Sequence, residues 1–463
     1  MISITFKELL EKIDFECFNM DIDTPVPNVS TDTRTIKEGN MYIPLKGENH
    51  DGHTFIFDAY MNKAGIAVVE KNVLDALKDI VSSKPYIVVE DSLEFLQAVS
   101  RVVMNKKKPI VVAVTGSTGK TTTKEMIFQV LDRKYNVLKT YGNYNNHIGL
   151  PLSILKMEDY HELLVLEMGM SNLGEIDFLA EIAKPSLAVI TNIGESHIEN
   201  LGSKDNILKA KMEISNYMTD KDCLLLDFED DFLKEVKNMD IDPIVKYSDS
   251  QLKLKDVKNL GEKGVEISIE YRGKDYLVPL KVPGIHNVNN AMLAFSVGLE
   301  MDLIPEDIIL GLSSYTGSKM RMDIVRTDDN IKVINDSYNA SPDSMKSALD
   351  VLSSLDCERR IAILGDMFEI GEYTERAHRK VGEFVSNSGI DILITLGKDS
   401  KYISEGAVDI GFNPSNVFNF ERYEMLENFI QSFVKEKDGV LVKGSRGMKM
   451  ERAVEYIIGR NKQ

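Results

Sequence analysis

The sequence predicts a three-domain α/β protein whose central domain holds a mostly parallel sheet. Length is the first reason, since 463 residues exceed one ordinary core and suggest three domains at roughly 150 residues each. From residue 110 onward, short apolar runs alternate with helical patterns, as in parallel sheets buried on both faces. Several runs end in glycine or polar residues, as strands of open α/β sheets do where they bind ligands.

The first domain is predicted to span residues 1–107. Its strand candidates are short and are separated by turn-rich segments, and they lie at Tyr42–Leu45, Ala67–Val69 and Ile87–Val89. A basic step, Lys-Lys-Lys-Pro at 106–109, follows them. We interpret this step as a linker into the second domain.

The second domain is predicted at residues 108–318 and contains a phosphate-binding turn. Residues 111–124 read V-V-A-V-T-G-S-T-G-K-T-T-T-K, an apolar strand followed by two glycines and a lysine. Gly116 and Gly119 permit positive φ angles and a close approach of amide N–H groups to an anion. Lys120 adds a cation, and Thr121 adds a hydroxyl suited to Mg²⁺ at the start of a helix. The common P-loop pattern needs its first glycine two positions earlier, so this loop is a shortened variant.

Further polar residues follow the other strand candidates of this domain, which are Leu163–Met168, Leu187–Thr191 and Cys223–Leu226. Glu167 ends one of them, and His197 closely follows the next. A carboxylate near phosphates suits Mg²⁺, whereas histidine is a less usual ligand. Glu167 is equally consistent with a capping or ion-paired residue, and His197 with a structural histidine. Lys209 and Lys211 lie in a helical pattern, for which a solvated charged face is the simpler interpretation.

The third domain is predicted at residues 319–463. Just before it, Asn287 and Asn290 precede an apolar helix pattern; an amide suits an adenine edge, but Asn287 equally suits a helix cap. Arg321 suits a phosphate, and an inter-domain salt bridge is equally consistent. Asp336 begins the segment D-S-Y-N-A-S-P-D, which is denser in functional groups than a turn requires. The strand candidates are Lys332–Asn335, Arg360–Leu364, Ile392–Leu396 and Val440–Lys443.

Composition limits the possible partners. With 55 basic and 73 acidic side chains the formal net charge is −18, which argues against nucleic-acid binding and binding to anionic membranes. The cysteines are widely spaced and form no zinc-binding pattern. The N-terminus lacks the features of a signal peptide, and no apolar run is long enough to span a bilayer. We therefore expect a cytoplasmic protein without membrane insertion.

These motifs resemble those of the Mur ligases, ATP-dependent amide-bond-forming enzymes of cell-wall (peptidoglycan) precursor synthesis. The resemblance covers nearly the whole chain and rests on T-G-S-T-G-K-T-T-T at 115–123, N-Y-N-N-H-I-G-L-P at 143–151, E-M-G at 167–169, T-N-I-G-E-S-H at 191–197, K-A-K-M-E-I at 209–214 and G-I-H-N-V-N-N at 284–290. Segments 32–47, 336–345 and 364–371 are most similar to members that add D-alanyl-D-alanine to UDP-N-acetylmuramoyl-tripeptide. Ser341 departs from the familiar motif, which has Asn at that place.

The resemblance implies an N-terminal UDP-substrate-binding α/β domain, a central P-loop ATPase domain and a C-terminal Rossmann-like α/β domain. It implies that ATP contacts Gly116, Ser117, Thr118, Gly119, Lys120, Thr121, Thr122, Asn287, Asn290, Arg321, Asp336 and Tyr338. The two small-molecule substrates would contact Asp32, Thr33, Arg34, Lys46, Gly47, Asn145, Asn146, Asn339 and Ser341. The residues implied in catalysis are Lys120, Lys211, His197 and Glu167. Two Mg²⁺ ions would be held by Thr121, Glu167, His197 and Lys211, the last after carbamylation by CO₂ to a carboxylate-like group.

The implied reaction has two steps. The tripeptide carboxylate attacks the γ-phosphorus of ATP to give an acyl phosphate and ADP, and the amine of D-alanyl-D-alanine then displaces phosphate from the carbonyl. Catalysis would come mostly from positioning and charge neutralisation. Closure of the third domain would exclude water. We expect a monomer.

Other functions stay open at this point. Another Mur-type ligase, or a folylpolyglutamate-synthase-like ligase, would share the ATP domain, although the block at 32–47 is expected of a uridine-nucleotide site. A nucleotide-binding switch would hydrolyse ATP regardless of D-alanyl-D-alanine. The motifs also leave open whether the third residue of the tripeptide is lysine or diaminopimelate.

Overall fold

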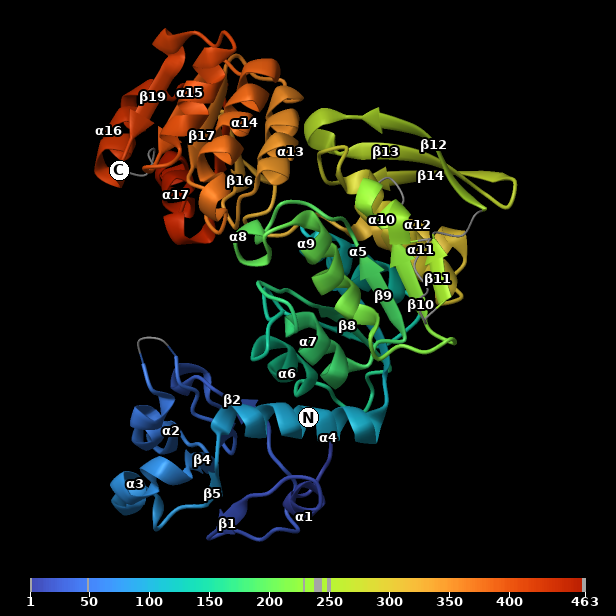
Figure 1. Cartoon of the computed structure of the whole chain (residues 1–463), viewed down its shortest axis with the longest axis vertical. Helices are drawn as coiled ribbons and strands as arrows, with labels where there is room; N and C mark the ends of the chain where they lie inside the picture. The colour runs from blue at the N-terminus through green and yellow to red at the C-terminus, as the bar shows by residue number, and fades with distance from the viewer. Residues whose placement is uncertain (1, 48–49, 228–229, 237–243, 248–250, 460–463) are drawn as a thin grey trace.

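The computed structural model describes residues 2–47, 50–227, 230–236, 244–247 and 251–459. Within this part of the chain the strands form four sheets. Three of them belong to α/β domains that follow one another along the longest axis of the molecule, and the fourth is a small antiparallel sheet beyond the central one (Figure 1). The predicted three-domain α/β architecture is confirmed.

The first domain is built on a five-stranded sheet in the order β1-β5-β4-β3-β2, in which only β1 runs antiparallel to its neighbour. Its centre is apolar on both faces, and every residue of the strand β4 is buried. The strands are β1 (Glu16–Phe18), β2 (Val29–Ser30), β3 (Met41–Tyr42), β4 (Ile66–Glu70) and β5 (Tyr86–Val89). The helices are α1 (Phe6–Leu10), α2 (Ile56–Met61) and α3 (Leu74–Val81).

The basic step that was predicted to be a linker is instead the end of a long helix. The helix α4 (Ser92–Lys107) runs between the first and central domains (Figure 1). It buries Phe95, Leu96 and Val99 in a hydrophobic core that continues from the first domain into the central one. Lysines stand in its last turn, where the helix dipole favours cations. The linker prediction was wrong because these charges serve a helix C-terminus.

The central domain contains a six-stranded, fully parallel sheet in the order β11-β10-β9-β6-β8-β7. Along β6, Val111 and Ala113 face one core, and Val112 and Val114 face the other. The strands are β6 (Ile110–Thr115), β7 (Val137–Lys139), β8 (Leu163–Glu167), β9 (Leu187–Ile190), β10 (Cys223–Leu226) and β11 (Ile244–Tyr247). The helices are α5 (Lys120–Leu131), α6 (Gly149–Ile154), α7 (Glu175–Ala183), α8 (Ile198–Leu201), α9 (Lys204–Met212), α10 (Asp231–Glu235), α11 (Asn287–Glu300) and α12 (Pro305–Ser314).

The small antiparallel sheet is a feature that the sequence analysis missed. It consists of β12 (Leu252–Asn259), β13 (Val265–Tyr271) and β14 (Lys274–Leu280), paired in chain order. Alternate residues of β13 are buried, and Ile267 and Ile269 join the core beneath α5 and α11. The sheet therefore covers one face of the central domain.

The third domain holds a six-stranded sheet in the order β15-β16-β20-β17-β18-β19, parallel except for the edge strand β15. Each strand predicted for this domain lies within one residue of its observed bounds at either end. The strands are β15 (Asp323–Arg326), β16 (Lys332–Asp336), β17 (Arg360–Gly365), β18 (Ile392–Leu396), β19 (Val417–Phe420) and β20 (Gly439–Lys443). The helices are α13 (Pro342–Ser353), α14 (Thr374–Asn387), α15 (Lys401–Asp409), α16 (Tyr423–Phe433) and α17 (Glu451–Gly459).

Among the described residues, no helix has both the length and the apolar character needed to cross a membrane.

Candidate active site

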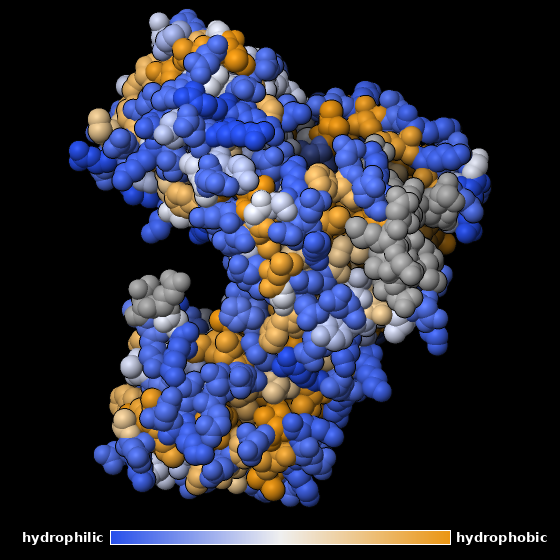
Figure 2. Space-filling view, in the orientation of Figure 1, coloured by the Kyte–Doolittle hydropathy of each residue, from blue (hydrophilic) through white to orange (hydrophobic). Residues whose placement is uncertain are grey.

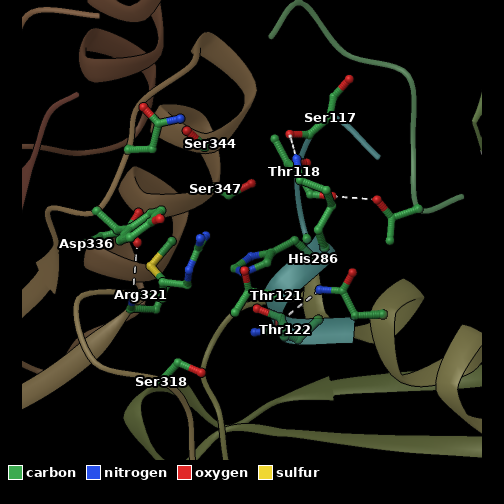
Figure 3. A pocket seen from close by; sticks show the side chains of 18 of the residues that line it. Ser117, Thr118, Thr121, Thr122, His286, Ser318, Arg321, Asp336, Ser344 and Ser347 are labelled. Atoms are coloured by element: carbon green, nitrogen blue, oxygen red, sulfur yellow. Dashed lines mark hydrogen bonds between the residues drawn. The ribbon is translucent and has the colours of Figure 1, made fainter. Parts of the chain in front are cut away.

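A cavity of about 940 Å³ lies between the carboxyl edge of the central sheet and the third domain. Figure 3 shows P-loop residues on one side of it and Arg321 and Asp336 on the other, with His286 between them. Most of the predicted site residues line it, namely Ser117, Thr118, Gly119, Lys120, Thr121, Thr122, Asn145, Asn146, Glu167, His197, Asn287, Asn290, Arg321, Asp336, Tyr338, Asn339 and Ser341. Those that do not are Gly116, Lys211 and the five predicted residues of the first domain.

The P-loop connects β6 to α5, and its glycines are required by close packing. Gly116 has φ 151°, and a Cβ there would lie 1.8 Å from Thr191 Oγ1. Gly119 has φ 78° and immediately precedes α5; a Cβ there would lie 2.6 Å from Asn290 Oδ1. The first turn of a helix leaves backbone N–H groups without intrahelical partners, and its dipole favours anions. This end of α5 is therefore suited to hold phosphate.

Lys120 is the cation of the P-loop. Its Nζ donates hydrogen bonds to the carbonyl oxygens of Gly116 at 2.7 Å and Ser117 at 3.3 Å. Its surroundings in the cavity lower its pKa to about 8 by desolvation; Glu167 opposes the shift and Arg321 adds to it. An anionic ligand would restore the charged form, because the nearby negative charge would favour the ammonium.

Glu167 stands at the end of β8, next to the P-loop, and is almost completely buried. Its Oε2 accepts a hydrogen bond from Thr121 Oγ1 at 2.9 Å, and its Oε1 accepts one from Asn145 Nδ2 at 2.9 Å. The buried Lys124 ammonium lies 3.5 Å from Oε2. Glu167 is thus both ion-paired, as one interpretation of the sequence allowed, and directed to the predicted Mg²⁺ ligand Thr121.

Lys211 and Lys209 differ sharply in environment, although both lie in α9. Lys209 is exposed, which agrees with the predicted solvated charged face. Lys211 is only 1% exposed, so that prediction was wrong for Lys211. Within the part of the chain that the structure describes, no hydrogen bond or ion pair reaches the Lys211 ammonium. Burial, with Lys120 as a second cause, lowers the pKa of Lys211 well below its ordinary value. Its amine is therefore inclined to lose its proton.

His197 follows β9 and makes contact with the third domain. Its Nδ1 lies 2.6 Å from Glu369 Oε2, and this contact lowers the pKa of Glu369. His197 also has a left-handed backbone, with φ 62°. The residue lines the cavity, as predicted, and its role as a metal ligand stays a prediction.

Arg321 enters the cavity from the third domain. Its guanidinium stacks on the ring of Tyr338, with Cζ 4.1 Å from the ring centroid. Among the described residues no carboxylate lies within ion-pair distance of it, so the salt bridge allowed by the sequence does not form there. The structure thus leaves a cation without a protein counter-ion opposite the P-loop (Figure 3).

Asp336 ends β16 and is held by its own domain. Its Oδ1 accepts a hydrogen bond from the Met322 N–H at 3.1 Å, and its Oδ2 pairs with the buried Lys443 ammonium. Lys443 also donates to the Asn339 carbonyl oxygen at 2.8 Å. Ser341 immediately precedes α13, and its N–H donates to Ser344 Oγ at 2.9 Å. These contacts shape the wall formed by the third domain, while the predicted ligand contacts of the same residues stay untested.

Asn287 and Asn290 lie at the start of α11, against the P-loop. Asn287 does not cap the helix; its Nδ2 donates to the Pro283 carbonyl oxygen at 2.7 Å. Asn290 Nδ2 donates to Asn287 Oδ1 at 3.2 Å, and its Oδ1 accepts from Thr123 Oγ1 at 3.1 Å. This pair fixes α11 against α5, and its contact with adenine stays a prediction. Asn146 likewise has a local role, because its Oδ1 accepts the N–H of Gly149 at the start of α6 at 2.8 Å.

The predicted residues of the first domain are not brought to this cavity. Asp32 accepts hydrogen bonds from the Arg34 backbone and guanidinium at 2.7–3.2 Å, and Thr33 follows within the same short turn. Lys46 pairs with the buried Glu70, and Gly47 is next to it. Figure 2 shows a hollow between the first and third domains. A ligand that reaches both groups of predicted residues must therefore span more than one domain.

The cavity wall also contains residues that were not among the predicted site residues, and two of them hold parts of the site in place. Lys443 ends the buried strand β20, and a lysine at the carboxyl end of a buried parallel strand was a visible signal. Asn192 accepts from the Thr118 N–H through Oδ1 at 2.9 Å and donates to Thr118 Oγ1 at 2.9 Å, which fixes the P-loop. Its place shortly after the buried strand β9 is visible in the sequence, but its partner Thr118 is not.

The oxygen donors suit Mg²⁺ more than a transition metal. Among the described residues no group of three or more His, Cys, Asp or Glu side chains is arranged to hold a metal. Mg²⁺ usually keeps waters and needs only one or two protein ligands besides the phosphates. The adjacent Thr121 hydroxyl and Glu167 carboxylate meet that requirement.

Comparison with known proteins agrees with this geometry. Residues 114–298 match the Mur ligase middle domain, and residues 320–446 match the Mur ligase, glutamate ligase domain. The UDP-N-acetylmuramoyl-tripeptide--D-alanyl-D-alanine ligase of Bacillus subtilis is 38% identical over 460 residues, which cover 99% of each chain.

Solved structures give the same result. MurF from Acinetobacter baumannii is similar with a TM-score of 0.86 and 27% identity, over 98% of this chain and 99% of the other. The MurF ligase from Thermotoga maritima in complex with ADP has a TM-score of 0.79 and 28% identity, over 94% and 98%. Full-length identity and matching domains place the chain in one family: it belongs to the Mur ligases.

Proposed function

We propose that this chain is an ATP-dependent ligase that joins D-alanyl-D-alanine to UDP-N-acetylmuramoyl-tripeptide. The observation that carries the proposal is the cavity between two domains, where the P-loop faces Arg321 of the third domain, which has no ion-pair partner among the described residues. In such a site the γ-phosphate of ATP would lie between cations from both sides. The full-length relatives with this named activity, and the ADP complex of one similar structure, support the same function.

In the proposed mechanism the chain acts mainly by positioning and charge neutralisation. The start of α5 and the Lys120 ammonium hold the ATP phosphates, and Arg321 faces the transferred group. The tripeptide carboxylate attacks the γ-phosphorus and forms an acyl phosphate, and ADP leaves. The D-alanyl-D-alanine amine then attacks the acyl carbon, and the carbon–oxygen bond to phosphate breaks. Enclosure between the two domains limits hydrolysis of the acyl phosphate by water.

Mg²⁺ is part of the proposal, with two ions expected. Thr121 and Glu167 would hold one, and His197 and a modified Lys211 would contribute to the second. Bound there, the ions would neutralise the charge that develops on the phosphate oxygens. The oxygen donors at Thr121 and Glu167 and the position of His197 in the cavity wall support this assignment.

Carbamylation of Lys211 is also proposed. The reaction needs a neutral amine, which attacks CO₂ and loses a proton to leave an anionic carbamate. Lys211 meets that need, because it is buried, has a lowered pKa and has no partner in the part of the chain that the structure describes. The product would place a negative group near the cationic Lys120, where the unmodified chain holds an amine.

The predicted roles of the first domain complete the proposal. Asp32, Thr33, Arg34, Lys46 and Gly47 would bind the UDP part, and the tripeptide would extend from there toward the cavity. We propose in addition that the protein is a monomer and works in the cytoplasm, where ATP and the nucleotide precursor are present. Parallel assays with UDP-tripeptides that carry either lysine or diaminopimelate test which third residue of the tripeptide the enzyme prefers.

Phosphate release distinguishes the ligase from a nucleotide-binding switch. It is measured with ATP and Mg²⁺ alone, with each substrate added singly, and with both substrates. The proposal predicts rapid release only when both substrates are present. Release at one rate in all four mixtures would refute it and favour a switch. A folylpolyglutamate-type ligase would respond to glutamate and a pteridine substrate instead.

A further inference from the structure

The contact between His197 and Glu369 joins two residues whose backbones both lie in the left-handed region. His197 has φ 62° and Glu369 has φ 63°, and neither is glycine. Such a conformation is unfavourable for residues with a Cβ, so it persists where the surroundings impose it. The two side chains meet across the boundary between the central and third domains, with Nδ1 and Oε2 2.6 Å apart.

The loop that carries Glu369 is held rigidly. Asp366, three residues earlier, accepts the backbone N–H groups of residues 398–400 at 2.7–3.1 Å. The Met367 N–H donates to His378 Nε2 at 3.0 Å, and the Phe368 N–H donates to Ser445 Oγ at 2.8 Å. These bonds hold the backbone just before Glu369, whose side chain is 55% exposed and has its contact with His197.

The central domain approaches this loop closely. A Cβ at Gly371 would lie 2.8 Å from Glu199 Cγ, so the segment after His197 packs directly against the loop. Farther along the same boundary, Lys380 Nζ lies 3.9 Å from Glu195 Oε1. The His197 contact is thus part of a continuous junction between the domains.

The orientation of the imidazole is informative. Glu369 Oε2 lies 2.6 Å from the buried Nδ1 as an ion-pair contact without regular hydrogen-bond geometry, and no hydrogen bond from a described residue reaches Nε2. His197 also lines the cavity that contains Thr121 and Glu167. A histidine that ligates a metal through one ring nitrogen commonly donates its other N–H to a carboxylate, which fixes the tautomer and the ring.

We propose that Glu369 is a positioning residue: its carboxylate, supplied by the third domain, holds His197 so that Nε2 is directed to the metal site of the central domain. The proposal rests on the proposed function, because it takes His197 as a metal ligand. It adds a consequence for the working enzyme. The metal site is complete only when the third domain is docked, so domain docking and metal binding strengthen each other.

The test measures metal binding apart from activity. Full-length protein with a non-hydrolysable ATP analogue and bicarbonate is titrated with Mn²⁺, and free Mn²⁺ is followed by electron paramagnetic resonance. The variants are Glu369→Ala, Glu369→Gln and His197→Ala. Glu372→Ala is the matched control, because Glu372 is exposed and lies three residues away in the same segment. Circular dichroism melting establishes that each variant is folded.

We expect Glu369→Ala to weaken Mn²⁺ binding by about 10- to 100-fold, the usual effect of losing such a carboxylate. Glu369→Gln should retain part of the affinity, because its carbonyl oxygen can lie against Nδ1 as the carboxylate oxygen does. Glu372→Ala should bind as wild type does. If Glu369 has a purely structural role, both Glu369 variants should melt at a lower temperature but bind Mn²⁺ with the same affinity as each other. That result would refute the proposal.

The remaining outcomes separate this inference from the proposed function. Unchanged or tighter Mn²⁺ binding in Glu369→Ala, with weakened binding in His197→Ala, would overturn the role of Glu369 and leave the metal assignment intact. Unchanged binding in both variants would remove His197 from the metal site, and the inference would fall with it. Ligase activity measured in parallel shows in each case whether the overall reaction is retained.

Discussion

Replacing Lys211 by methionine should make the protein more stable and inactive at the same time. In the unmodified chain the Lys211 side chain is 1% exposed and has no protein partner among the described residues. Burial lowers its pKa well below the ordinary 10.5. The lowered pKa means that burial in the folded chain disfavours the charged ammonium. Methionine has a similar shape and no charge to desolvate.

We therefore expect Lys211→Met to raise the free energy of unfolding at neutral pH by about 1–3 kcal/mol, the usual cost of burying a polar group without a partner. For a domain of this size, each kcal/mol corresponds to roughly 2–4 °C in melting temperature. The pH dependence has a definite sign. Between the lowered folded pKa and 10.5 the unfolded chain binds more protons than the folded one, so wild-type stability rises with pH in this window. Lys211→Met should lack that rise.

The measurement is thermal unfolding by circular dichroism in degassed, bicarbonate-free buffer between pH 6 and 10, with ligase activity assayed separately. Lys209→Met is the control, because Lys209 is exposed on the same helix, and it should change neither property. Lys211→Ala should be nearly inactive and should regain some activity when a small carboxylate such as formate is added. A Lys211→Met protein that is less stable than wild type, or a fully active Lys211→Ala, would refute the reasoning.

Three further predictions concern the ATP site. Gly119→Ala should weaken ATP binding and lower the melting temperature, because a left-handed alanine costs about 1–2 kcal/mol and its Cβ would lie 2.6 Å from Asn290 Oδ1. Gly174→Ala is the control measured by calorimetry, because Gly174 also has a positive φ, 85°, but its Cβ would meet open space. Equal ATP affinities in the two variants would contradict the predicted clash at Gly119. ATP affinity measured without Mg²⁺ should fall as pH rises from 7 to 9, because Lys120, with a pKa of about 8, loses its positive charge in that window. An affinity that does not change with pH would show that Lys120 does not hold the phosphates. Arg321→Ala should raise the dissociation constant of ATP by about 10-fold or more, since a charged hydrogen bond contributes about 1.5–3 kcal/mol. Arg321→Lys should lose less ATP affinity, because it keeps the positive charge. Unchanged ATP affinity in both variants would place the guanidinium outside the phosphate site.

Local sequence patterns determined much of the fold. Cys223–Leu226 and Ile392–Leu396 were predicted with the bounds that the structure shows, because continuous apolar runs have few alternatives to a doubly buried strand. The P-loop was also evident, since its glycines and Lys120 are adjacent in the chain. The alternation of buried residues in β13 was present as well, but a strand that is buried on one face lacks the continuous apolar run that marks a doubly buried strand.

Other features depend on contacts between distant residues. Lys211 is polar and lies in a charged helix, so its burial follows only from the packing of α9 against the central sheet. Asp336 pairs with Lys443, 107 positions later, and His197 meets Glu369 only because the domains dock. No local pattern contains these pairs. The basic step at 106–109 shows the opposite error, because like charges that resemble a linker also suit a helix end.

The central claim is that a peptide carboxylate takes the γ-phosphate of ATP. It is tested most directly with UDP-tripeptide whose terminal carboxylate is labelled with ¹⁸O, incubated with ATP, Mg²⁺ and D-alanyl-D-alanine in unlabelled water. The account predicts, by mass spectrometry, a UDP-pentapeptide product and released phosphate that carries one ¹⁸O from the carboxylate. Phosphate without the label, its new oxygen coming from water, would mean that ATP is hydrolysed directly, and it would contradict the account.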